Sequence, residues 1–127
     1  MTVSIYDIIS ANPIFTKILQ HEFTGKQSFI IGRILKTLNN EAEMFNKTRE
    51  EMLKKYAAVD EDGKIIVIDG NVKIREGEMA NFQKEINDLL YTLLEINVNK
   101  IPLDWLENLK LTPQEMLILE PFLLIEE

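Results

Sequence analysis

The feature that most constrains this chain is an uninterrupted helical pattern over residues 26–56. Apolar positions recur there at alternating steps of three and four, which is the spacing of an a/d seam on one helix face. The seam consists of Leu35, Leu38, Ala42, Phe45, Met52 and Tyr56, with Arg49 as its one charged position. At 1.5 Å per residue the pattern predicts a single helix of roughly 46 Å. The apolar face of such a helix needs partners along its whole length.

The periodicity changes directly after this helix. Asp60-Glu61-Asp62-Gly63 has the composition of a turn, and residues 64–68 form a largely β-branched run. Asp69-Gly70 is a strong signal for a two-residue hairpin turn, because this dipeptide tolerates positive φ at both positions. The sequence therefore predicts a β-hairpin with strands near 64–68 and 72–75. A lone hairpin is marginal in water, so it must pack on something or gain strands from a partner.

A second helix is predicted from about residue 78 to residue 94. Its apolar positions again repeat by three and four, at Met79, Phe82, Ile86, Leu89 and Leu93, with Leu90 and Leu94 beside them. At about 17 residues, or roughly 25 Å, it covers only half of the first helix. The natural packing is an antiparallel helical hairpin with the β-hairpin at its tip. The other half of the long helix must be covered by the chain ends or by another subunit.

The first 24 residues predict two short helices. Ser4 and Asp7 have the capping-box spacing for a helix over 5–11. Asn12-Pro13 then has the chemistry of a second helix start, with Asn at the N-cap and Pro at the first helical position. Thr24-Gly25 ends the pattern.

The C-terminal third predicts short elements that cover the open half of the long helix. Residues 96–101 alternate as a short strand, and 103–109 predict one or two helical turns with Trp105, Leu106 and Leu109 facing inward. Thr112-Pro113-Gln114-Glu115 is a helix start with a capping box. The apolar segment 116–125, interrupted by Pro121, is expected to dock on Ile30, Ile31 and Ile34. The alternative is that part of this segment forms a subunit or partner interface.

These elements together predict a single domain over residues 1–127 of mainly α (α+β) class. It comprises short N-terminal helices over 1–24, then the long helix, the β-hairpin and the second helix over 25–94. An acidic C-terminal extension over 95–127 completes it. This extension carries five of the seven net negative charges of the chain.

No residue pattern specifies a catalytic or metal chemistry. The chain has no cysteine, and its one histidine, His21, lacks the partners of a catalytic triad. Asp60, Asp62 and Gly63 match a calcium loop only in part, and the paired carboxylates are expected to lie on solvated helix faces. The sequence predicts no cofactor and no metal. A net charge of −7 argues against direct nucleic-acid binding, and no apolar run approaches the length of a membrane span.

The order of several motifs resembles a known family of phage proteins. The motifs begin with Lys54-Lys55-Tyr56 and Asp60-Glu61-Asp62-Gly63 and continue with Asp69-Gly70-Asn71 and the run over 82–90. The ending over 111–122 completes the resemblance, which covers roughly residues 25–125. The family comprises small proteins of unknown function encoded by tailed phages and prophages of Gram-positive bacteria. The resemblance implies a phage origin, and it carries over no site residue. Since residues 1–10 have no signal-peptide pattern, the expected location is the bacterial host cytoplasm.

The order of helix, β-hairpin and helix also resembles a β-type prefoldin subunit in topology. The unequal helices and the C-terminal extension differ from that pattern.

The hypothesis from the sequence is a non-enzymatic phage accessory protein that acts by protein–protein interaction. Its partner would be a host nucleic-acid enzyme or defence protein that it inhibits, because carboxylates can occupy sites built for phosphates. The candidate partner-binding residues are Glu107, Glu115, Glu120 and Phe122. The alternative is a virion assembly chaperone or structural accessory protein with a prefoldin-like helical hairpin, whose partners are phage structural proteins. Both hypotheses allow the chain to form a homo-oligomer.

Overall fold

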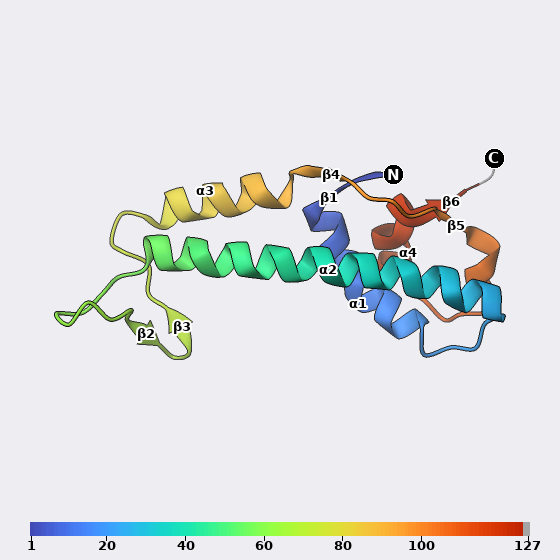
Figure 1. Ribbon diagram of the computed structural model, residues 1–127, viewed down its shortest axis with the longest axis horizontal. Coiled ribbons are helices and arrows are strands. Elements are labelled where there is room, and N and C mark those ends of the chain that lie inside the picture. Colours follow the sequence, from blue (N-terminus) through green and yellow to red (C-terminus); the bar gives the residue numbers. More distant parts are fainter. Residues whose placement is uncertain (126–127) are drawn as a thin grey trace.

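The computed structural model describes residues 1–125 and shows an elongated molecule built along one helix. This helix, α2, runs from Gly25 to Tyr56 over 32 residues, as the periodicity predicts. Figure 1 shows the other helices gathered at two places along it, with both chain termini beside the half in which α2 begins. The mixed α+β class predicted from the sequence is confirmed.

The first helix, α1, spans Ile5–Ile18 and is preceded by the short strand β1, Thr2–Ser4. The predicted capping box is present: the Ser4 hydroxyl accepts from the amide of Asp7 at 3.0 Å, and the Asp7 carboxylate accepts from the amide of Ser4 at 3.1 Å. The predicted second start at Asn12-Pro13 is wrong, because the helix continues through Pro13. Proline in a helix interior removes one backbone hydrogen bond. The side chains of Ile8, Phe15 and Ile18 are fully buried. Because they lie before and after Pro13 on the same buried face, they keep the segments on both sides of Pro13 in one helix.

A second capping box opens α2, where Thr24 and Gln27 exchange backbone–side-chain hydrogen bonds. The sequence analysis interprets Thr24-Gly25 only as the end of the N-terminal helical pattern and does not predict this capping box. Three positions in the first half of α2, Ile31, Ile34 and Leu38, are buried. From residue 41 to residue 55 no side chain is fully buried, so the second half of the helix is covered only in part.

The β-hairpin forms at the far end of α2, with strands β2, Val67–Ile68, and β3, Asn71–Val72. Asp69 and Gly70 have φ of 52° and 80°, which are the positive values that their turn signal predicts. The strands are shorter than predicted. Single bridges join Ala57 to Ile74 and Val59 to Ile65. The segment that follows α2 therefore pairs with residues beside both hairpin strands, which the sequence analysis did not predict.

The helix α3, Met79–Leu90, returns along the second half of α2 in the opposite chain direction (Figure 1). It contacts α2 through Lys55 Nζ and Glu85 Oε1, 2.7 Å apart, and through the rings of Tyr56 and Phe82, whose centroids lie 5.9 Å apart. The predicted continuation to Leu94 is wrong. Residues Leu93–Glu95 form strand β4, which pairs antiparallel with β1.

The C-terminal segment forms β5, Ile101–Pro102, the 3-10 turn η1, Leu103–Leu106, helix α4, Pro113–Leu119, the turn η2, Glu120–Phe122, and β6, Leu123–Leu124. β5 pairs in parallel with β6, so the predicted strand over 96–101 is present only at its last residue. The Thr112 capping box is confirmed by the hydrogen bonds that Thr112 and Glu115 exchange.

The core lies around the first half of α2 and takes side chains from both chain ends. Its buried members are Val3, Ile8, Ala11, Ile14, Phe15, Ile18, Ile31, Ile34, Leu38, Ile96, Ile101, Leu106, Leu119, Phe122 and Leu123. The segment 116–125 shares this core with Ile31 and Ile34, as expected, but α4 packs chiefly on α1. The described core thus concentrates at one end, and the α2–α3 pair extends from it as a stalk.

Candidate functional site

The four candidate residues predicted from the sequence do not share one surface. Phe122 is fully buried, with its ring edge-on to Phe15, so it cannot contact a partner while the fold is intact. Glu107 and Glu120 are exposed. Glu115 is partly covered and already bonded within the chain. Of the three predicted carboxylates, Glu107 and Glu120 have no ion-pair partner within residues 1–125.

Glu115 has a structural role that accounts for its position. Its carboxylate accepts from the Thr112 amide at 3.0 Å and from Lys17 Nζ at 3.2 Å. The Thr112 amide, and then the Lys17 ammonium, lower the pKa of Glu115 because both stabilise the charged form. Glu115 thus joins α4 to α1.

Glu107 lines a shallow groove beside the C-terminal segment, named here the acidic groove. The groove has a volume of about 510 Å³ and is lined by Pro102, Leu103, Asp104, Trp105, Glu107 and Leu124. Two carboxylates thus flank apolar side chains that solvent reaches. Ile125, which follows Leu124, is 51% exposed. Glu126 and Glu127, counted among the acids of the C-terminal extension, lie outside the described residues.

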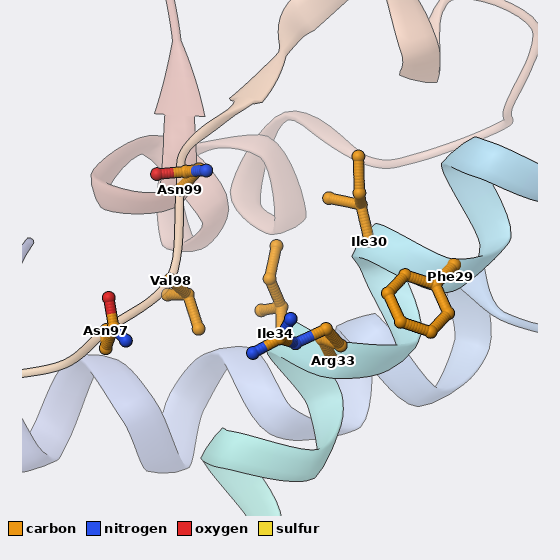
Figure 2. A pocket seen from close by; sticks show the side chains of 7 residues that line it. All are labelled: Phe29, Ile30, Arg33, Ile34, Asn97, Val98 and Asn99. Atoms are coloured by element: carbon orange, nitrogen blue, oxygen red, sulfur yellow. The ribbon is translucent and has the colours of Figure 1, made fainter.

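A second groove lies between the first half of α2 and the extended segment 97–99, and is named the basic groove. Figure 2 shows Phe29, Ile30, Arg33 and Ile34 projecting from α2, with Asn97, Val98 and Asn99 on the facing segment. Its volume is about 290 Å³. The guanidinium of Arg33 lies between the helix and the segment in this view, with Ile34 and Val98 near it.

The chemistry of the basic groove is cationic and aromatic. Phe29 is 66% exposed, and the guanidinium carbon of Arg33 lies 6.0 Å from its ring centroid, at the outer limit of a cation–π contact. An adjoining hollow on α2 adds Lys36, Thr37 and Asn40. The sequence interpretation missed this groove. The available signal was that residues 25–40 contain three bases and no acid in a chain with net charge −7.

A third surface lies at the end of the stalk and is named the tip surface. It consists of Val59, Ile65, Val67 and Ile68, of which Val67 is 58% and Ile68 53% exposed. All four belong to the bridged segment or to the β-hairpin. Large β-branched side chains on a short, open hairpin are costly to leave in water.

The titratable groups in the stalk join its two helices. The Glu85 carboxylate accepts from Lys55 Nζ and from the Tyr56 hydroxyl, each at 2.7 Å. These bonds lower the pKa of Glu85, and the bond to Glu85 raises the pKa of Lys55 and of Tyr56. Tyr56 is buried, whereas solvent reaches the side chains of Lys55 and Glu85, and the bonds among the three hold α3 on α2.

The partial calcium motif is used as a turn. The Asp60 carboxylate accepts from the amides of Asp62 and Lys64, at 2.9 and 3.0 Å. Within residues 1–125, no group of three or more histidine, aspartate and glutamate side chains is placed to hold a metal ion. His21 is exposed in the connection between α1 and α2.

Comparisons with protein-family models, curated proteins and solved structures found no match for this chain. Across the described part of the chain, no helix has both the length and the apolar character that crossing a bilayer requires.

Proposed function

We propose that this chain is a non-enzymatic phage accessory protein that acts by protein–protein interaction through the tip surface. The phage origin rests on the resemblance of its motif order to the phage family. The observation that carries the interaction is the exposure of Val59, Val67 and Ile68 at the end of the stalk remote from the described core.

The tip surface has two properties that suit a protein partner. Its β-branched side chains gain free energy when a partner removes them from water. The segment that leaves α2 pairs with the base of the hairpin, but β2 and β3 form a sheet of two strands, so their outer edges at residues 67–68 and 71–72 can pair with a strand of another chain. The 32-residue α2 holds this surface away from the rest of the molecule, where a large partner can reach it.

The leading partner class is a host nucleic-acid enzyme or defence protein that the chain inhibits. Under this proposal Glu107 and Glu120 supply negative charge where the partner normally takes phosphate. Reversing both charges, as Glu107→Lys with Glu120→Lys, is expected to abolish inhibition. Unchanged inhibition by this variant excludes phosphate mimicry, and Glu115→Gln is a matched control because Glu115 is engaged with Lys17.

A second candidate function is an assembly chaperone or structural accessory protein of the virion. The observation that favours it is the antiparallel course of α2 and α3 with a β-hairpin at their end, which resembles the prefoldin arrangement (Figure 1). In that case the tip surface holds a phage structural protein during assembly.

A tagged pull-down from infected and uninfected host lysates, read by mass spectrometry, tests both candidates. A host enzyme or defence protein in both lysates supports inhibition, whereas phage structural proteins in the infected lysate alone support assembly. The double variant Val67→Ser with Ile68→Ser should lose the partner in either case. Leu117→Ser is the control, because Leu117 is 69% exposed on α4, outside the tip surface. Equal capture by both variants contradicts the assignment to the tip surface.

A further inference from the structure

The acidic and basic grooves lie on neighbouring stretches of one segment but carry opposite charge. Residues 97–99 form one wall of the basic groove, and residues 102–107 form most of the acidic groove. Arg33 charges the first groove and Lys36 lies in the adjoining hollow on α2, while Asp104 and Glu107 charge the second groove. None of these four residues takes part in an ion pair within the part of the chain that the structure describes.

We propose that the surface around the basic groove of one copy of this chain, including Lys36 of the adjoining hollow, contacts the surface around the acidic groove of a second copy, and that this contact is reciprocal. A two-fold axis that places one groove on its complement does the same for the other pair, because residue contacts in such an interface occur twice. The product is a closed dimer with Arg33 and Lys36 of each copy facing Asp104 and Glu107 of the other.

The apolar side chains of the two grooves are complementary in the same way. Phe29 stands exposed on the rim of the basic groove, and Leu103 and Leu124 are 39% and 49% exposed in the acidic groove. Aromatic rings and leucines in contact give an interface an apolar centre, which charges alone do not supply. Both grooves therefore offer the two components that a dimer interface requires.

The extended segment beside the basic groove also has free bonding capacity. Among the described residues, neither the backbone nor the side-chain amides of Asn97 and Asn99 form a hydrogen bond with the rest of the chain. Two side-chain amides and an unpaired extended backbone can bond the polar groups of a second chain.

Light scattering tests this proposal on the full chain, on variants in which one set of charges is reversed, and on a variant in which both sets are reversed. The wild type should have twice the 14.8 kDa mass of one chain at micromolar concentration. Arg33→Glu with Lys36→Glu should raise the dimer dissociation constant about tenfold or more, because like charges then face each other. Asp104→Lys with Glu107→Lys should do the same. The variant carrying all four changes should form the dimer again, since the two charge sets have only exchanged places.

The control is Lys47→Glu, which reverses an exposed charge on the stalk beside Glu43 and should leave the dimer unchanged. Circular dichroism establishes that each variant is folded. A wild-type dimer should also weaken when sodium chloride rises from about 50 to 500 mM, a test that needs no variant.

Three results overturn the proposal. These are a wild-type monomer throughout the micromolar range, a dimer that neither reversal weakens, and a fourfold variant that is folded but does not dimerise again. The tip surface is unchanged in all these variants, so capture of a partner at the tip succeeds or fails independently. Glu120→Lys alone tests inhibition without changing a residue of the dimer contact, because Glu120 does not line the acidic groove.

Discussion

The ring of Phe122 meets the ring of Phe15 edge-on, with centroids 5.6 Å apart and an interplanar angle of 87°. Both side chains are fully buried, and they join the first helix to the C-terminal segment across more than a hundred residues of sequence. An edge-to-face aromatic pair adds about 0.5–1.5 kcal/mol beyond the area it buries. The stability of the core end therefore depends on a contact between the two ends of the chain.

Replacing Phe122 by alanine is expected to lower the free energy of unfolding by about 3–5 kcal/mol, because it leaves a cavity against Phe15 and Leu119. Urea denaturation followed by circular dichroism measures the change. Leu117→Ala is the matched control on the exposed side of α4 and should alter the free energy of unfolding by less than about 0.5 kcal/mol. Equal effects of the two substitutions would show that Phe122 is not a core residue.

The attachment of α4 to α1 should depend on pH through Glu115. Its pKa lies below the ordinary value of 4.5 in the folded chain, since the Thr112 amide and Lys17 favour the carboxylate. The contribution to stability is therefore complete above pH 4.5 and is lost as the pH falls through the lower folded-state pKa.

In Glu115→Gln the amide can keep the capping-box bond but has no charge to lose. This variant should show a smaller decline in melting temperature than the wild type as the pH is lowered below 4.5. Glu120→Gln, at an exposed position on the same segment, serves as the control. Parallel pH profiles for Glu115→Gln and the wild type would contradict the assigned role.

The hairpin turn should depend on glycine at position 70. Gly70 has φ of 80°, and a branched L-residue there is strained by roughly 1–2 kcal/mol. We expect Gly70→Val to loosen the tip without unfolding the core. Hydrogen exchange should show faster exchange of the Ala58 and Lys73 amides, which bond the hairpin backbone, and no change at Phe15. Uniform acceleration throughout the chain would argue against a separately stable tip.

The elements that the sequence predicts correctly are those determined by local chemistry. The capping boxes at Ser4 and Thr112 and the positive φ of Asp69 and Gly70 depend on residues no more than three positions apart. The long helix follows from a period sustained over 32 residues. In each case the determining interactions lie within a few turns of the chain.

The errors occur where distant segments decide the conformation. Leu93 and Leu94 continue the helical spacing of α3, but pairing with Ser4 and Val3 places them in a strand. Pro13 has the chemistry of a helix start, yet the buried face of α1 keeps it inside one helix. These outcomes depend on contacts that no local window contains.

The candidate surfaces were predictable only in part. The exposed hairpin follows from the predicted β-hairpin, and Glu107 was identified from charge alone. Phe122 was misplaced because an apolar C-terminal segment has the same composition whether it docks on the core or on a partner. The basic groove was missed because Arg33 and Asn97 are far apart in sequence and meet only in the fold.

The proposal that the tip surface binds a protein partner is tested most directly by site-specific photo-crosslinking during infection. A benzophenone side chain replaces Val67 at the tip or Lys47 on the stalk, both exposed positions of the same protein. We predict one discrete crosslinked product from position 67, with a host protein or a phage structural protein, and none from position 47. No product from position 67, or the same products from both positions, would contradict the account.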